Sequence, residues 1–122
     1  MPIHVFKDVG GYPRKHVDGP SRETNIAGSK VANAVSLVFG IWSLDDTEEP
    51  FPETVIPFDE IKHVLTGFVE FKDLMSGNTY TGEPGTTIWL PRGSKLQILR
   101  TKDFSAHWTA MMEATECDIT EQ

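Results

Sequence analysis

The hydrophobic positions of this chain fall into short segments that favour β-strands over helices. The most apolar segment, residues 35–44 (VSLVFGIWSL), is a nearly unbroken run with β-branched and aromatic members. Such a run suits a strand that is buried on both faces. A short helix is the alternative, but Gly40 in the middle of the run disfavours it. No segment shows the 3.6-residue period of an amphipathic helix, and no internal repeat is visible.

Further short, β-rich segments follow an acidic loop that contains three prolines. We expect strands at residues 60–66, 68–72, 79–81, 86–90, 96–100 and 106–112. Glycine-, proline- and serine-containing turns, or short polar stretches, separate these segments. Short strands with turn signals at this spacing predict an all-β fold, which is a sandwich, a barrel or a jelly roll.

The chain divides into three regions of different composition. Residues 1–30 are rich in glycine, proline and charge, and they predict an irregular arm with at most one short strand at residues 3–6. Residues 31–112 hold the expected strands of the barrel, and residues 113–122 form an acidic tail. A length of 122 residues fits one domain.

Charge and cysteine content limit the partners and the compartment. Eleven Lys and Arg against eighteen Asp and Glu give a net charge of −7, and residues 43–60 and 113–122 carry acids without a single base. Such a surface repels phosphate, so we expect no nucleic-acid partner. The chain has no long apolar run and no visible secretory signal, and its one cysteine, Cys117, cannot form an internal disulfide. We therefore expect a soluble protein of the cytoplasm that has no membrane partner.

Two motifs have informative spacing. In DEIKHVLTG, six residues separate Glu60 from Gly67, and in GTTIWLPRG, five residues separate Gly85 from Pro91. These spacings resemble the two halves of the cupin superfamily. The longer phrases FDEIKHVLTGFVEF and TGEPGTTIWLPRGSKLQI look like the cupin domain of the ethanolamine-utilisation EutQ family. The resemblance covers roughly residues 38–112 and implies a cupin-type jelly-roll barrel with its site inside.

The resemblance also implies where metal ligands would stand. Most cupins have two histidines before the glutamate of the first motif and one more after the second. The corresponding positions here hold other residues: Thr54, Ile56 and Leu96, or Glu53 and Val55 if the first spacing is one residue longer. A catalytic metal takes three or more protein ligands, and only Glu60 remains. We expect neither a metal nor another cofactor, and we expect Thr54, Ile56 and Leu96 to line a ligand site.

Glu60 is the leading catalytic candidate. In the resembled family this side chain points into the barrel, and the alternation of a strand places Lys62 on the same face. A carboxylate and an amine side by side in an apolar cavity form the kind of pair that acid–base catalysis uses. The alternative is a salt bridge that closes the barrel mouth.

Other residues are weaker candidates. His107 can act as a proton shuttle if it faces inward, although a buried structural histidine is at least as good an interpretation. The alternation of Thr87 and Trp89 with Ile88 and Leu90 predicts that Trp89 lies on the cavity face. There its ring forms a wall for a ligand, although plain core packing is the more common use. Arg14, on the arm, can fold over the mouth.

Together these residues predict a metal-independent enzyme of the lyase, dehydratase or isomerase type, with a small-molecule ligand in the barrel. The alternative is a non-catalytic metabolite-binding or accessory cupin. We also expect a homodimer, because sheet edges need cover and the arm can add a strand to a neighbouring sheet.

Overall fold

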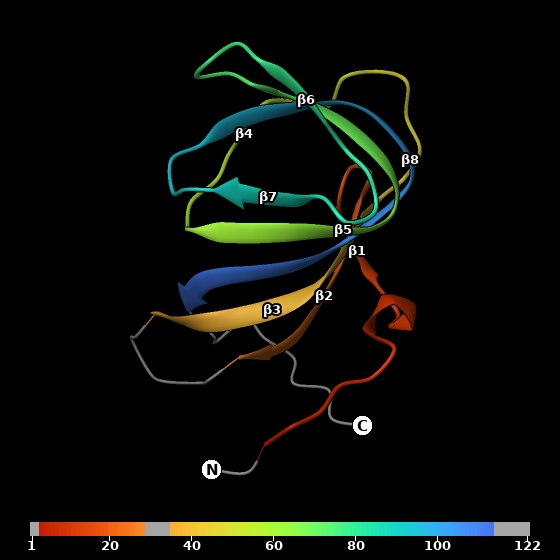
Figure 1. Cartoon of the computed structure of the whole chain (residues 1–122), viewed down its shortest axis with the longest axis vertical. Coiled ribbons are helices and arrows are strands. Elements are labelled where there is room, and N and C mark those ends of the chain that lie inside the picture. Colours follow the sequence, from red (N-terminus) through yellow and green to blue (C-terminus); the bar gives the residue numbers. More distant parts are fainter. Residues whose placement is uncertain (1–2, 29–34, 114–122) are drawn as a thin grey trace.

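The computed structural model describes residues 3–28 and 35–113, which form one antiparallel sheet of eight strands (Figure 1). The hydrogen-bonded order is β1-β2-β3-β8-β5-β6, with β4 also paired to β8 and β7 to β5. The elements are the 3-10 turn η1 (Val9–Gly11), β1 (Lys15–Asp18), β2 (Ser21–Gly28), β3 (Val35–Leu44), β4 (Thr54–Val55), β5 (Glu60–Asp73), β6 (Thr79–Gly82), β7 (Thr87–Leu90) and β8 (Lys95–Glu113).

The two longest strands, β5 and β8, fold the sheet over on itself. Their first and last parts pair with different neighbours: β3 and β7 belong to one half of the sheet, and β4 and β6 to the other. Gly67, with φ of 71°, and Asp103, with φ of 49°, lie where both strands bend. A side chain at Gly67 would overlap the carbonyl groups of Lys102 and Asp103, so only glycine fits this bend. Figure 1 shows the two halves facing each other.

The inner faces of both halves enclose the main core. It consists of buried residues from β3, β5 and β8: Leu44, Val64, Val69, Ile98, Phe104 and Ala106. Among the described strands, β6 and β7 each pair only with β5, so the folded sheet stays open between them.

The prediction of an all-β, cupin-type jelly roll is confirmed, and residues 35–44 form a strand with the expected bounds. Burial of this strand on both faces is wrong, because Leu37 on the outer face is 62% exposed. The segments at 60–66 and 68–72 are one strand, as are those at 96–100 and 106–112. The turn signals between them mark bends within strands.

The N-terminal region differs most from expectation. Residues 3–14 are irregular apart from η1, and residues 3–6 form no strand, whereas residues 15–28 form the hairpin β1–β2 that extends the sheet. Cys117 and the acidic tail beyond Glu113 lie outside the described residues. In the described part of the chain, no helix has the length and hydropathy of a membrane span.

Candidate functional site

A buried ion pair lies on the inner face of the sheet at the start of β5. Lys62 Nζ lies 2.6 Å from Glu60 Oε1, and the two residues are 9% and 6% exposed. The ammonium group also lies 3.9 Å from the centroid of the Trp42 ring, which gives it a second favourable contact. Lys62 therefore does not reach outward into solvent. The structure brings the two leading candidates together.

A second carboxyl group, Glu23 on β2, lies near this ion pair. Glu23 stands opposite Trp42 in the β2–β3 register, so both side chains are on the inner face. Burial raises the pKa of Glu23 above its usual 4.5, the charge of Lys62 opposes this rise, and the charge of Glu60 adds to it. The inner face thus carries two carboxyl groups around one ammonium group. Glu23 holds its proton to a higher pH than a free glutamate does.

The space inside the folded sheet is small. A cavity of about 30 Å³ adjoins Lys62 and is otherwise lined by apolar and aromatic side chains. This volume accommodates about one or two water molecules. A metabolite therefore requires movement of the cavity walls to reach the ion pair.

A larger cleft of about 570 Å³ opens beside β6, β7 and the turn at residues 91–94. This volume is within the range of about 300–1,000 Å³ that is typical of small-molecule sites. Four apolar side chains line both the cleft and the inner cavity, and so separate them: Phe71, Ile88, Leu90 and Leu96. Arg92 and Lys95 add two positive charges to the cleft, and Asp73 adds one carboxylate. The cleft is thus an entrance that apolar side chains close on the inner side.

Trp89 does not form a wall of the barrel cavity. The register of β5 and β7 pairs Glu60 with Leu90 and Lys62 with Ile88, so Leu90 and Ile88 point inward. Trp89 points to the outer face, is 60% exposed and lines the outer cleft, not the inner cavity. The prediction that it faces the cavity is wrong, because β7 has large apolar residues on both faces and the alternation alone does not show which is inside.

His107 also lies on the outer face, so the inward orientation that its role as a proton shuttle requires is not present. It stands opposite His63 in the β5–β8 register, and its ring stacks on Phe39 with the centroids 5.5 Å apart. Burial, with a smaller contribution from His63, lowers the pKa of His107 below its usual 6.5. Its neighbour Trp108 is the residue that points inward, opposite Lys62.

Of the remaining candidates, Leu96 lines the inner cavity that adjoins Lys62, and the other three do not. Leu96 lines both cavities, and it pairs in register with Thr54, which is exposed. Ile56 is buried but lines neither cavity. Arg14 donates a 2.8 Å hydrogen bond to the Gly10 carbonyl and also lines neither cavity.

Three solved structures of similar fold show what this chain resembles. The EutQ protein of Clostridium difficile is 16% identical and aligns over 87% of this chain and 75% of its own, with a TM-score of 0.56. The cupin domain of Schizosaccharomyces pombe Cnp3 is 12% identical over 92% of this chain and 77% of its own, with a TM-score of 0.61. The chain has the cupin fold. The expected similarity to cupins, EutQ included, is confirmed at the level of the fold.

The third similar structure is an enzyme by name. The polyketide cyclase RemF from Streptomyces resistomycificus is 15% identical over 92% of this chain and 79% of its own, with a TM-score of 0.64. No protein-family model and no curated protein matches the chain by sequence. Similarity at this level shows the fold alone, and a cupin fold is compatible with catalytic and non-catalytic proteins.

The positions that correspond to the metal ligands of cupins carry no ligand cluster in the described part of the chain. Residues 3–28 and 35–113 contain no group of three His, Cys, Asp or Glu side chains that could hold a metal ion. Thr54, Ile56 and Leu96 stand at the positions where the cupin motifs predict histidine. The expected metal independence stays a prediction, which elemental analysis tests.

Sequence analysis missed Glu23 because it assigned residues 1–30 to an irregular arm. The segment SRETNIAG is polar on its inner face, so it lacks the alternation that marks a half-buried strand. The signal that could have found it is the position of Ile26, which is fully buried, between the turn at Gly19-Pro20 and the apolar strand β3.

Proposed function

We propose that this cupin-fold protein is a metal-independent enzyme that moves protons on a small metabolite, by a lyase, dehydratase or isomerase reaction. The observation that carries the proposal is the array of Glu60, Lys62 and Glu23 on the inner face, next to a ligand-sized cleft. Enzymes need two proton-transfer groups within reach of one ligand. Two carboxyl groups in different environments can take opposite roles, one as the base that accepts a proton and the other as the acid that donates one.

The array divides the roles in a simple way. Glu60, ionised and paired with Lys62, accepts a proton from a carbon next to a carbonyl group. Burial keeps Glu23 protonated to a higher pH, so Glu23 can act as the acid. It donates a proton to a different carbon atom of the substrate in an isomerisation, or to a departing hydroxyl group in a dehydration. Lys62 offsets the negative charge that develops on the carbonyl oxygen. His107 has no part in this scheme, and Trp89 contributes only to the wall of the outer cleft.

The positive side chains of the cleft favour a substrate that has an anionic group. Arg92 and Lys95 favour a carboxylate or phosphate at the cleft. The body of the substrate must then displace Phe71 or Leu96 to reach Glu60. Removal of water from the site on entry would strengthen the electrostatic contacts.

The test combines binding and turnover. Thermal-shift measurements with small hydroxy acids, keto acids and sugar phosphates identify ligands, because a ligand that binds only the folded chain raises its melting temperature. Any ligand found is then incubated in deuterated water and examined by NMR. Exchange of a carbon-bound hydrogen, or conversion of the ligand, that Glu60→Gln slows by about 100-fold or more supports the proposal. Ligands that bind without exchange or conversion contradict it.

A non-catalytic metabolite-binding role is the second candidate. It is favoured by the small inner cavity and by the mutual pairing of Glu60 and Lys62, which satisfies both charges without a ligand. In this case ligands bind in the outer cleft alone. Glu60→Gln then leaves affinity unchanged, whereas Lys95→Ala weakens the binding of anions.

A further inference from the structure

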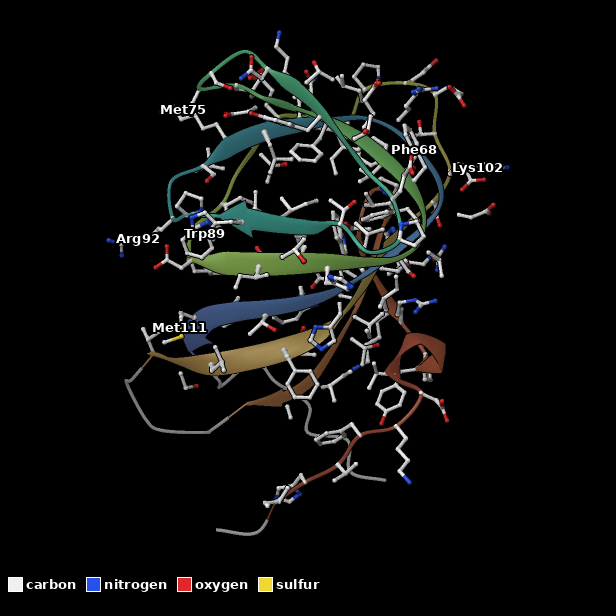
Figure 2. All side chains as sticks on the ribbon, viewed as in Figure 1. Phe68, Met75, Trp89, Arg92, Lys102 and Met111 are labelled. Atoms are coloured by element: carbon white, nitrogen blue, oxygen red, sulfur yellow. The ribbon has the colours of Figure 1, made fainter. Side chains whose placement is uncertain are left out.

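The cleft beside β6 and β7 has a rim of exposed apolar side chains. Three elements contribute to it: the turn after β5 with Met75, β6 with Tyr80 and β7 with Trp89. These residues are 70%, 47% and 60% exposed, respectively. Figure 2 shows Met75 and Trp89 on the same side of the molecule as Arg92. Single exposed apolar residues are ordinary, but several around one concave site indicate a place for a ligand.

Arg92 and Lys95 bring positive charge to this cleft without a carboxylate partner. In the described part of the chain neither side chain forms an ion pair, whereas Arg22, Arg100 and Lys102 each do. The chain as a whole has a net charge of −7, so unpaired cations in a cleft are an exception on its surface. They are available to an anionic ligand.

The turn that carries Arg92 is held in place by hydrogen bonds. The backbone N–H of Arg92 donates to Asp59 Oδ1 at 2.9 Å, and the N–H of Gly93 donates to the Ile56 carbonyl at 2.8 Å. Gly93 has a φ of 92°, which a glycine adopts without strain. Asp59 thus anchors the backbone of Arg92, and it forms no ion pair with the guanidinium group. The position of this cation is set before a ligand binds, which lowers the entropic cost of binding.

The other polar side chains of the cleft are largely engaged within the protein. The two carboxylate oxygens of Asp73 accept hydrogen bonds from Ser76 Oγ and from the Met75 N–H, each at 2.8 Å, and these bonds lower the pKa of Asp73. Four hydroxyl groups of the cleft also bond to other parts of the chain, namely those of Tyr80, Thr86, Thr87 and Ser94. A polyhydroxylated ligand such as a sugar needs several free polar side chains, and this cleft offers few.

We infer that the cleft binds an aromatic carboxylate, with the ring against Trp89 and the carboxylate at Arg92. A planar ring matches the aromatic and thioether side chains of the rim. A guanidinium group binds a carboxylate through two parallel hydrogen bonds. Two cations and one carboxylate leave the cleft with one net positive charge, which matches a monoanion better than a phosphate dianion.

This inference deepens the proposed function, and it rests on that function insofar as the aromatic acid is the substrate. In that case the remainder of the ligand faces Phe71 and Leu96, the side chains that separate the cleft from the cavity beside Lys62. Binding at the cleft does not itself require turnover.

NMR titrations of the full chain with four probes test the inference. The probes are phenylacetate, phenylacetamide, cyclohexylacetate and glucuronate. Phenylacetate should bind most tightly. Phenylacetamide lacks the charge and should bind about 10-fold more weakly, and cyclohexylacetate lacks the aromatic ring and should bind about threefold more weakly. Glucuronate has the charge but an unsuitable body, and it should bind most weakly of the charged probes.

Two variants assign the contacts. Arg92→Ala should raise the dissociation constant of phenylacetate about 10-fold and leave that of phenylacetamide unchanged. Trp89→Ala should raise the dissociation constants of both phenyl probes about threefold. Both side chains are exposed, so both variants should fold, which circular dichroism checks. Lys72→Ala is the matched control: it removes the same charge from β5, but Lys72 follows Phe71 and points to the other face of the strand. This variant should keep the wild-type affinity.

Three results would overturn the inference: no binding of phenylacetate, binding of phenylacetamide or glucuronate as tight as that of phenylacetate, or equal losses from Arg92→Ala and Lys72→Ala. Any of them removes the aromatic acid as the ligand class and leaves the acid–base reaction to the exchange experiment with Glu60→Gln. A failure of that exchange experiment, in turn, leaves the binding site in the cleft intact.

Discussion

The ion pair of Glu60 and Lys62 is the residue-level feature with the largest expected energy. Both groups are removed from water, so each needs the other to offset the loss of hydration. Trp42 and Glu23 add to the environment of the ammonium group, but neither replaces a direct contact of 2.6 Å. The ion pair can contribute both to stability and to catalysis. The variant Glu60→Gln measures the contribution to stability.

Glu60→Gln should lower the free energy of unfolding by about 3 kcal/mol, because it leaves a buried ammonium group without its counter-charge. The double variant Glu60→Gln, Lys62→Met should recover most of this loss, since it removes the uncompensated charge. Urea denaturation measures both. Asp45→Asn is the control: it breaks the exposed pair with Arg22 and should change stability little, because water screens this pair. A loss from Glu60→Gln no larger than that of the control would mean that the pair contributes little.

Glu23 predicts a pH dependence of stability. Its pKa is raised in the folded chain, so the folded chain binds this proton more tightly than the unfolded chain does. The contribution of Glu23 to stability is therefore present below its usual pKa of 4.5 and is lost as the pH rises through the raised value. Glu23→Gln removes this dependence and should stabilise the chain at pH 7. Denaturation of both proteins from pH 4 to 7 measures the difference, and a difference that does not change with pH contradicts the assignment.

Part of this residue-level picture follows from the sequence and part does not. Alternation within β5 is enough to place Lys62 beside Glu60, since one strand has one period. The faces of Trp89 and His107 depend on the registers of β7 and β8 with β5, which are contacts between distant segments. Glu23 requires the pairing of β2 with β3, where the polar inner side of β2 conceals the strand.

At the scale of elements, the bend in β5 at Gly67 allows the sheet to fold over on itself. The sequence marks this point with Gly67 in LTGF, and analysis of the sequence alone interprets it as the end of a strand. In the structure the strand continues, because backbone pairing with β8 resumes beyond the bend. Continuity of this kind depends on the partner strand, whereas the positions of the apolar segments from residue 35 onward are local and follow from the sequence.

Gly67→Ala should destabilise the chain by more than about 2 kcal/mol, because a left-handed backbone costs an L-residue 1–2 kcal/mol and the new methyl group meets two carbonyl groups as well. Gly77→Ala is the matched control. Gly77 has a similar φ of 80° but no atom within 4 Å of an added Cβ, so only the backbone term applies. The difference between the two variants in thermal or urea melts isolates the close approach of β5 and β8. Equal losses would show that the approach at Gly67 is not tight.

At the scale of the whole molecule, the fold brings together the two motifs that resemble those of cupins. The side chains between them differ from the histidine ligands that most cupins have there. The first motif contributes Glu60 to the inner face, and the strand after the second contributes Leu96 to the wall shared by the cavity and the cleft. Apolar side chains thus occupy space that polar ligands would need. The fold follows from the sequence, because strand pattern and motif spacing agree, whereas the size of the inner cavity depends on side-chain packing from both halves of the sheet.

This arrangement predicts that the purified protein carries no stoichiometric metal. Thr54 and Ile56 precede Glu60 where histidines would be needed, and Leu96 offers no donor atom. Protein prepared without chelators, and dialysed against metal-free buffer, should contain well under one ion of zinc, iron, manganese or nickel per chain by elemental analysis. Leu96→His is a useful comparison: it restores one ligand beside the cavity, but with Glu60 it makes only two, so metal content should stay low. A full equivalent of metal in the wild-type protein would contradict the prediction and indicate a rearranged site that includes Glu60 and Glu23.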